Sequence, residues 1–116
     1  SHDLYHGTGP KTMARFNEKI IPYETQDRLM DVFCYILTEL KTKEEKKDFL
    51  KDLLNRQERI MLIRRLMIAE LLSDGKNYSQ IAKRLKCGKS TIARVQRWLN
   101  FGRGGYKKAL KIEIKK

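Results

Sequence analysis

Residues 78–99 read YSQIAKRLKCGKSTIARVQRWL, and this stretch decides the fold. Apolar residues recur in it at spacings of three and four, which predicts two short helices that each bury one face. Ala82 is the small residue that lets the helices cross closely, and Lys-Cys-Gly at 86–88 supplies a tight turn. The pattern is that of a helix-turn-helix. The expected apolar anchors are Ile81, Leu85, Ile92, Val95 and Leu99.

The turn departs from the usual pattern in one respect. A glycine commonly follows the first helix directly, but this chain has Lys86 there and places Gly88 two residues later. We therefore expect Lys86 to adopt a positive φ, which is uncommon for lysine. Cys87 should fill the apolar slot inside the turn. Neither Cys87 nor Cys34 has a cysteine or histidine partner at metal-binding spacing, so both are expected to be reduced thiols.

The face of the second helix that points away from the anchors predicts the function. Lysine and arginine reach guanine acceptors or phosphates, and serine and threonine contact bases or phosphates. Polar residues of the preceding helix could hold the DNA backbone. The alternative is a solvated basic helix pair in a protein-interaction module. The expected DNA-binding residues are Ser79, Gln80, Lys83, Lys86, Lys89, Ser90, Thr91, Arg94 and Arg97.

The charge of the chain is concentrated at one end. The net charge is +12, yet residues 1–75 contain 13 basic and 13 acidic residues. Residues 76–116 contain 13 basic residues and one acid, Glu113. This asymmetry suits a polyanion-binding end on a neutral scaffold. Membrane surfaces are also anionic, so the charge alone does not select DNA.

Four further helices are predicted. Thr25 can cap a helix over residues 26–40, and Thr42 with Glu45 forms a capping box for a second one. Asn55 with Glu58 can form a similar capping box for a third helix, which should reach about Ser73. It is apolar around much of its circumference, which places it at the centre of a bundle or of an intertwined dimer. The last should run from Tyr106 to about Ile114.

Residues 1–12 (SHDLYHGTGPKT) show no helical periodicity. We expect a vector-derived leader before a natural start at Met13, and the alternative is a native disordered arm. Residues 13–116 should form a single helical domain. No run of 18 apolar residues and no secretory leader is visible, so we expect a cytoplasmic protein without a membrane partner. No nucleophile–base pair or metal cluster is visible either, so we predict that the chain is not an enzyme.

The segment from about residue 25 to residue 112 resembles the Trp repressor superfamily, in particular its YerC/YecD-type branch. The most specific match is Leu99-Asn100-Phe101-Gly102 followed by Gly105-Tyr106. The resemblance implies an all-α, six-helix, intertwined homodimer that binds double-stranded DNA. It also implies two recognition helices in successive major grooves, with half-sites about 34–36 Å apart. The docking geometry comes with the resemblance.

The resemblance also raises the question of a corepressor. In Trp repressor, one arginine on the central helix and one on the recognition helix bracket tryptophan. Arg94 matches the second arginine, and Arg64 or Arg65 matches the first. The alternative is a phosphate contact for Arg94 and a surface or interface ion pair for Arg64 or Arg65. We favour this alternative, and hence no cofactor, because the YerC-type branch has no established tryptophan requirement.

These observations together predict a sequence-specific transcriptional regulator, a dimeric repressor that uses its helix-turn-helix in the major groove. The alternative is a helical nucleic-acid or protein interaction module without operator specificity. Trp98 is expected to be a core or interface anchor rather than a platform for stacking bases.

Overall fold

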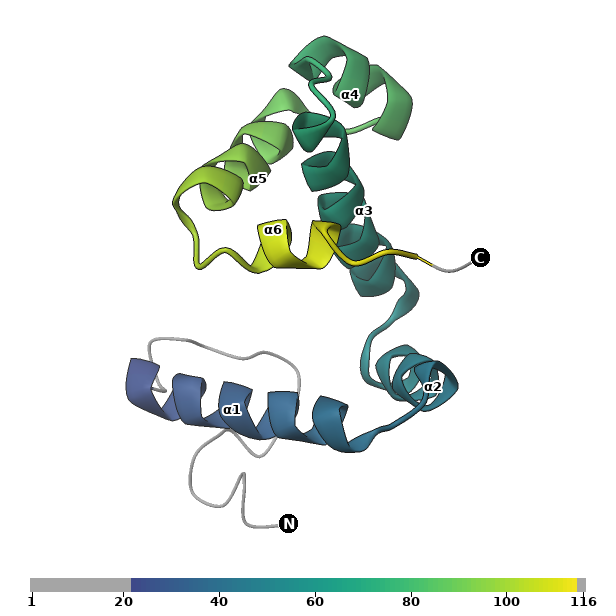
Figure 1. The fold of residues 1–116 in the computed structure, drawn as a ribbon, viewed down its shortest axis with the longest axis vertical. Coiled ribbons are helices and arrows are strands. Elements are labelled where there is room, and N and C mark those ends of the chain that lie inside the picture. Colours follow the sequence, from purple (N-terminus) through teal and green to yellow (C-terminus); the bar gives the residue numbers. More distant parts are fainter. Residues whose placement is uncertain (1–21, 115–116) are drawn as a thin grey trace. The chain divides into compact units, whose positions relative to one another are not determined.

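The computed structural model describes residues 22–114 and is all-helical over that range (Figure 1). This confirms the predicted all-α fold of about six helices. The expected leader at residues 1–12 and the start at Met13 lie outside the described residues. In chain order the helices are α1 (Tyr23–Glu39), α2 (Lys43–Leu53), α3 (Arg56–Ser73), α4 (Tyr78–Leu85), α5 (Lys89–Phe101) and α6 (Gly105–Leu110).

The chain divides into two compact units, with the boundary between Phe49 and Leu50 inside α2. In the first unit the rings of Phe33 and Phe49 lie 6.0 Å apart. The predicted capping box at the start of α2 is present, because Thr42 Oγ1 accepts from the amide of Glu45 at 3.0 Å. The Glu45 carboxylate in turn accepts from the amide of Thr42 at 3.1 Å.

The first helix begins earlier than the sequence predicted. The expected cap at Thr25 is wrong, because α1 already starts at Tyr23 and Pro22 precedes it. The carbonyl of Pro22 accepts from the amides of Thr25 and Gln26, both at 3.1 Å. A proline is tolerated at the start of a helix because its missing N–H would have no partner there.

The core of the second unit is built from α3, α4 and α5. The capping box predicted at the start of α3 is present: Asn55 Oδ1 accepts from the amide of Glu58 at 2.9 Å, and the Glu58 side chain accepts from Asn55. Tyr106 and Leu110 of α6 pack against the core. Burial of each large aliphatic side chain stabilises the unit by about 1.5–3 kcal/mol. The buried residues are Ile68, Ala69, Leu71, Ile81, Ile92, Val95 and Leu99.

The last helix is shorter than predicted, because α6 ends at Leu110 and not near Ile114. The amides of Lys111 and Ile112 donate to carbonyls three residues earlier, both at 3.2 Å, which tightens and ends the helix. Ile112 and Ile114 are 70% and 77% exposed and therefore find no apolar face to pack on within this unit.

From its start to Met67, α3 leaves its large apolar residues exposed, and only the part that begins at Ile68 enters the core. The exposed fractions range from 37% for Met61 to 58% for Ile63. The exposed apolar residues of α3 are Ile60, Met61, Leu62, Ile63, Leu66 and Met67.

No helix among residues 22–114 is both long and apolar enough to cross a membrane.

Candidate nucleic-acid interface

The helix α4 is fixed at its start by a capping box that the sequence analysis missed. Asn77 Oδ1 accepts from the amide of Gln80 at 2.8 Å, and Gln80 Oε1 accepts from the amide of Asn77 at 2.9 Å. The local pattern Asn-x-x-Gln was the signal that could have revealed it. Gln80 is exposed, but its carbonyl oxygen is used inside the fold. Only the side-chain NH2 group of Gln80 is therefore left for the predicted DNA contact.

The turn between α4 and α5 has the predicted conformation. Lys86 has φ +52° and ψ +53°, which confirms the expected positive φ. Its amide and that of Cys87 both donate to the carbonyl of Ala82. Gly88 is extended, and its carbonyl accepts from the amides of Thr91 and Ile92 at 3.2 and 3.4 Å. The first two bonds end α4 and the last two begin α5, so the turn between the helices takes only residues 86–88.

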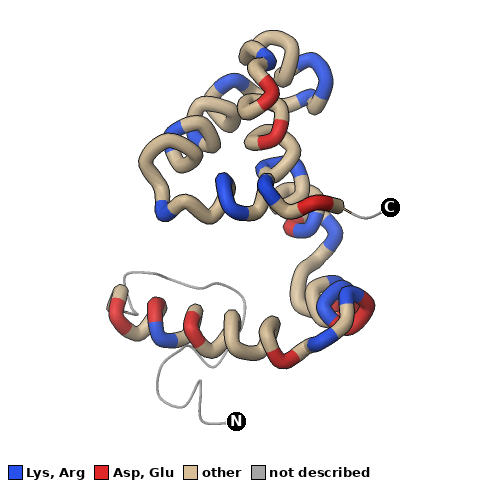
Figure 2. The backbone as a smooth tube through the Cα atoms, viewed as in Figure 1, with Lys and Arg blue, Asp and Glu red and all other residues tan. Residues whose placement is uncertain are grey.

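The two faces of α5 are separated as the sequence predicted. Ile92, Val95 and Leu99 are buried against the core. Of the nine residues expected to contact DNA, eight are exposed, and Thr91 is partly buried. Lysines and arginines lie along α4, α5 and α6 (Figure 2). The sequence after Asp74 contains a single acidic residue, Glu113. The interface is therefore basic and accessible.

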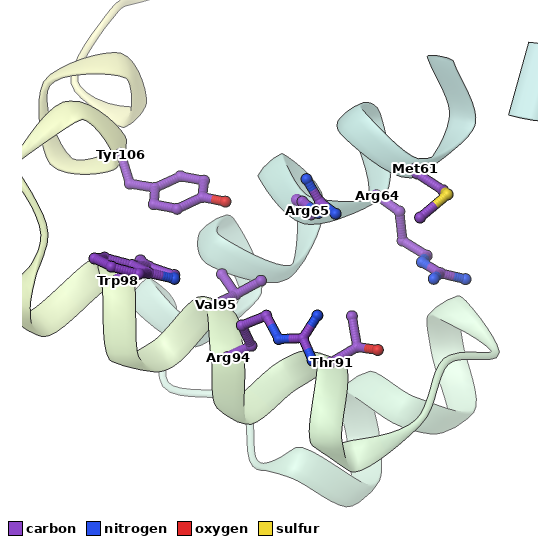
Figure 3. Close-up of a pocket in the computed structure, with 8 residues that line it drawn as sticks. All are labelled: Met61, Arg64, Arg65, Thr91, Arg94, Val95, Trp98 and Tyr106. Atoms are coloured by element: carbon purple, nitrogen blue, oxygen red, sulfur yellow. The ribbon is translucent and has the colours of Figure 1, made fainter. Parts of the chain in front are cut away.

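A pocket of about 270 Å³ opens between α3, α5 and α6 (Figure 3). It brings together Arg64, Arg65 and Arg94, the three arginines that the sequence analysis singled out for a corepressor. No acidic residue lines it, and Arg64 Nε is buried without a hydrogen-bond partner among the described residues. The full lining is Met61, Arg64, Arg65, Thr91, Arg94, Val95, Trp98 and Tyr106.

Trp98 has a different environment from the core position that the sequence analysis allowed. It is 52% exposed and lines the pocket together with Tyr106, at the end away from Arg64 in Figure 3. An interface role for Trp98 stays a prediction. The sequence analysis did not place Trp98 in this pocket, although Thr91, Arg94 and Trp98 are spaced by three and four on one face of a helix. Tyr106 carries no such signal, because it comes from another helix.

The described residues show no group of three or more His, Cys, Asp or Glu side chains that could hold a metal ion. The chemistry that this surface offers is hydrogen bonding and charge from lysine, arginine and hydroxyl groups.

Comparisons with known proteins agree with this geometry. The family model described as Trp repressor protein matches residues 28–114. The protein YerC of Bacillus subtilis (strain 168) is 38% identical over 82 residues, which are 71% of this chain and 78% of YerC. A crystal structure of a TrpR-like protein from Eubacterium eligens ATCC 27750 is similar with a TM-score of 0.61 and 27% identity. The match covers 82% of this chain and 93% of that one.

Proposed function

Because the chain belongs to the Trp repressor family, we propose that it is a sequence-specific repressor that occupies operator DNA with α5 in the major groove. Members of this family are DNA-binding regulators and not enzymes. The observation that carries the proposal is the start of α5. Its inward residues Ile92 and Val95 are buried in the core, while basic and hydroxyl side chains at the same end are exposed.

In this proposal, contacts to phosphates and contacts to bases have different roles. Lysines and α4 side chains such as Ser79 bind phosphates, which supplies affinity and orients the protein on the duplex. Lys89, Ser90 and Arg94 reach base edges, which supplies specificity. Thr91 is partly buried. It therefore has less of its side chain available for bases than the exposed residues around it.

The exposed apolar residues of α3 support a homodimer. Exposed apolar residues around a helix of a single chain mark an interaction site, and a two-fold dimer covers them with the same residues of a second copy. The two α5 helices would then meet successive major grooves about 34 Å apart. Sedimentation equilibrium should give a mass near twice 13.7 kDa. A regulator of chromosomal DNA acts in the cytoplasm, and we place the chain there.

Selection of bound DNA from a random pool tests the proposal. The expected result is a two-fold symmetric site that the protein prefers over scrambled DNA by at least about a thousandfold. Arg94→Ala should weaken binding to the selected site by about 5–150-fold, equivalent to about 1–3 kcal/mol, and relax the base preference at one position. Arg56→Ala is the matched control, because Arg56 is exposed at the start of α3, outside the helix-turn-helix. Equal effects of both variants would contradict the assignment of Arg94.

A second candidate, control by a small molecule, is favoured by one observation. Three arginines line one pocket without an acid to balance them, and the carboxylate of a tryptophan-like corepressor would pair with one of them. The alternative is that Arg94 serves DNA binding alone, as proposed above, and that Arg64 or Arg65 pairs with an acid across the dimer. Calorimetry with millimolar tryptophan decides between them. The absence of heat, together with unchanged DNA affinity, excludes tryptophan as the corepressor.

A further inference from the structure

Lys86 has an unusual backbone conformation. It is the one non-glycine residue among residues 22–114 with a positive φ, and the other two such positions are Gly75 and Gly104. The left-handed helical region brings the Cβ of an L residue close to the following carbonyl oxygen, so side chains other than glycine are disfavoured there. The chain therefore has a lysine where a glycine would be more stable.

The fold requires this conformation but not the lysine side chain. The left-handed residue ends α4, and it directs Cys87 back against the core and Gly88 to the start of α5. The amide of Cys87 donates to the carbonyl of Ala82 at 3.3 Å, which uses only backbone atoms. A glycine at position 86 could make the same turn at lower cost.

The Lys86 side chain makes no interaction that would stabilise the fold. It is exposed, and it has no hydrogen bond or ion pair with any residue of the described range. Lys83 and Lys89, three residues away on either side, are also exposed. The junction of α4 and α5 therefore carries three lysine ammonium groups next to the helix that we propose to enter the major groove.

We propose that Lys86 contacts a DNA phosphate and that the chain gives up folding stability for this contact. The inference rests on the proposed function, because it gives one residue of the same interface a specific role and a reason for its strained backbone. A strained residue is retained at a functional site when its side chain does what the unstrained residue cannot do. Glycine makes the turn but has no charge, whereas lysine makes the turn with strain and supplies the ammonium group.

The test compares thermal stability and DNA affinity in four full-chain variants. Lys86→Gly and Lys86→Asn relieve the strain and remove the charge, because asparagine is several-fold enriched in the left-handed region. Lys86→Arg keeps both the strain and the charge. Lys47→Ala is the control for a lost charge elsewhere, since Lys47 is exposed on α2 and has no ion pair within the described residues.

Opposite changes are expected in the two measurements. Lys86→Gly should raise the melting temperature, but by less than the rise of about 4–8 °C that 1 kcal/mol of relieved strain alone would give, because glycine also gains freedom in the unfolded chain. It should also weaken binding to duplex DNA and lower the slope of log K against log salt by about 0.9 per chain, the value for one lost phosphate contact. Lys86→Asn should show a smaller rise in melting temperature with the same change in slope. Lys86→Arg should match the wild type in both measurements, and Lys47→Ala should leave the salt slope unchanged.

Two results would overturn the proposal. If Lys86→Gly is more stable but binds DNA with the wild-type affinity and salt slope, the lysine makes no phosphate contact. If neither Lys86→Gly nor Lys86→Asn, which avoids the added chain freedom of glycine, is more stable than the wild type, the position carries no strain. Failure of the underlying function looks different: the wild type itself would then not bind duplex DNA, or would not prefer a selected site over scrambled DNA, whatever the variants do.

Discussion

Gly102→Ala should destabilise the second unit, for a reason that only the coordinates reveal. Gly102 follows the last residue of α5, and its amide donates to the carbonyl of Trp98 at 2.9 Å. A Cβ atom built on Gly102 would lie closer than 3.0 Å to that same carbonyl oxygen, a separation that real Cβ atoms essentially never show. Its φ of −83° is ordinary, so the obstacle is the close approach and not the dihedral angle.

The cost follows from the two ways in which the chain can relieve this clash. Breaking the hydrogen bond between Gly102 and Trp98 costs about 0.5–1.5 kcal/mol. Keeping it forces an overpacked backbone, which costs about 1–3 kcal/mol. Replacing glycine by alanine also restricts the unfolded chain, which contributes about 0.4–1 kcal/mol in the opposite direction. The direct comparison with wild type therefore understates the clash.

Gly105→Ala is the matched control that removes this opposing contribution. Gly105 is the first residue of α6, and a Cβ there would meet no atom within 4 Å. Both variants restrict the unfolded chain equally, so their difference isolates the clash at Gly102. We expect Gly105→Ala to be slightly more stable than wild type and Gly102→Ala to be less stable than Gly105→Ala by about 1–3 kcal/mol.

Thermal unfolding followed by far-ultraviolet circular dichroism measures both variants. A difference of 1 kcal/mol corresponds to about 4–8 °C in melting temperature for a small domain. The Gly102→Ala protein should therefore melt at least about 4 °C below the Gly105→Ala protein. Equal melting temperatures, or the reverse order, would refute the close approach between Gly102 and Trp98.

Five further variants test the core, the start of α4 and the dimer. Ile92→Ala should cost about 2–5 kcal/mol and Ile92→Val about 0.5–1.5 kcal/mol in urea unfolding, because Ile92 is fully buried; equal costs would contradict its burial. Asn77→Ala should cost about 0.5–2 kcal/mol through loss of the helix cap, and an unchanged urea midpoint would argue against the cap. Ile63→Lys should convert a dimer to a monomer in sedimentation, whereas Ile112→Lys should not, although Ile112, which follows α6, is also an exposed isoleucine.

Much of the helix-turn-helix could be predicted from the sequence because its determinants are local. The spacing of Ile81, Ile92 and Val95 predicts which face of each helix is buried, and the structure buries all three. The positive φ of Lys86 also follows from its place directly after the first helix. The capping box of Asn77 and Gln80 was equally local and could have been read from the same stretch.

The ends of the outer helices were harder to predict. Thr25 is a good capping residue, but Pro22 already satisfies the start of α1 three residues earlier. At the other end, Ile112 and Ile114 continue an apolar pattern that predicts a longer helix, yet α6 stops at Leu110. Local propensity does not reveal whether a neighbouring surface exists for such residues to pack on, and packing provides most of a helix's stability.

The sequence by itself determined the helices, the buried face of α5 and the basic end of the chain, because helical periodicity and charge are properties of neighbouring residues. Only the tertiary structure decided that Arg64 and Arg65 of α3, Arg94 of α5 and Tyr106 of α6 line one pocket. Periodicity states which residues share a face of one helix. Which faces of different helices meet depends on how those helices cross, and that is fixed by the packing of side chains far apart in the sequence.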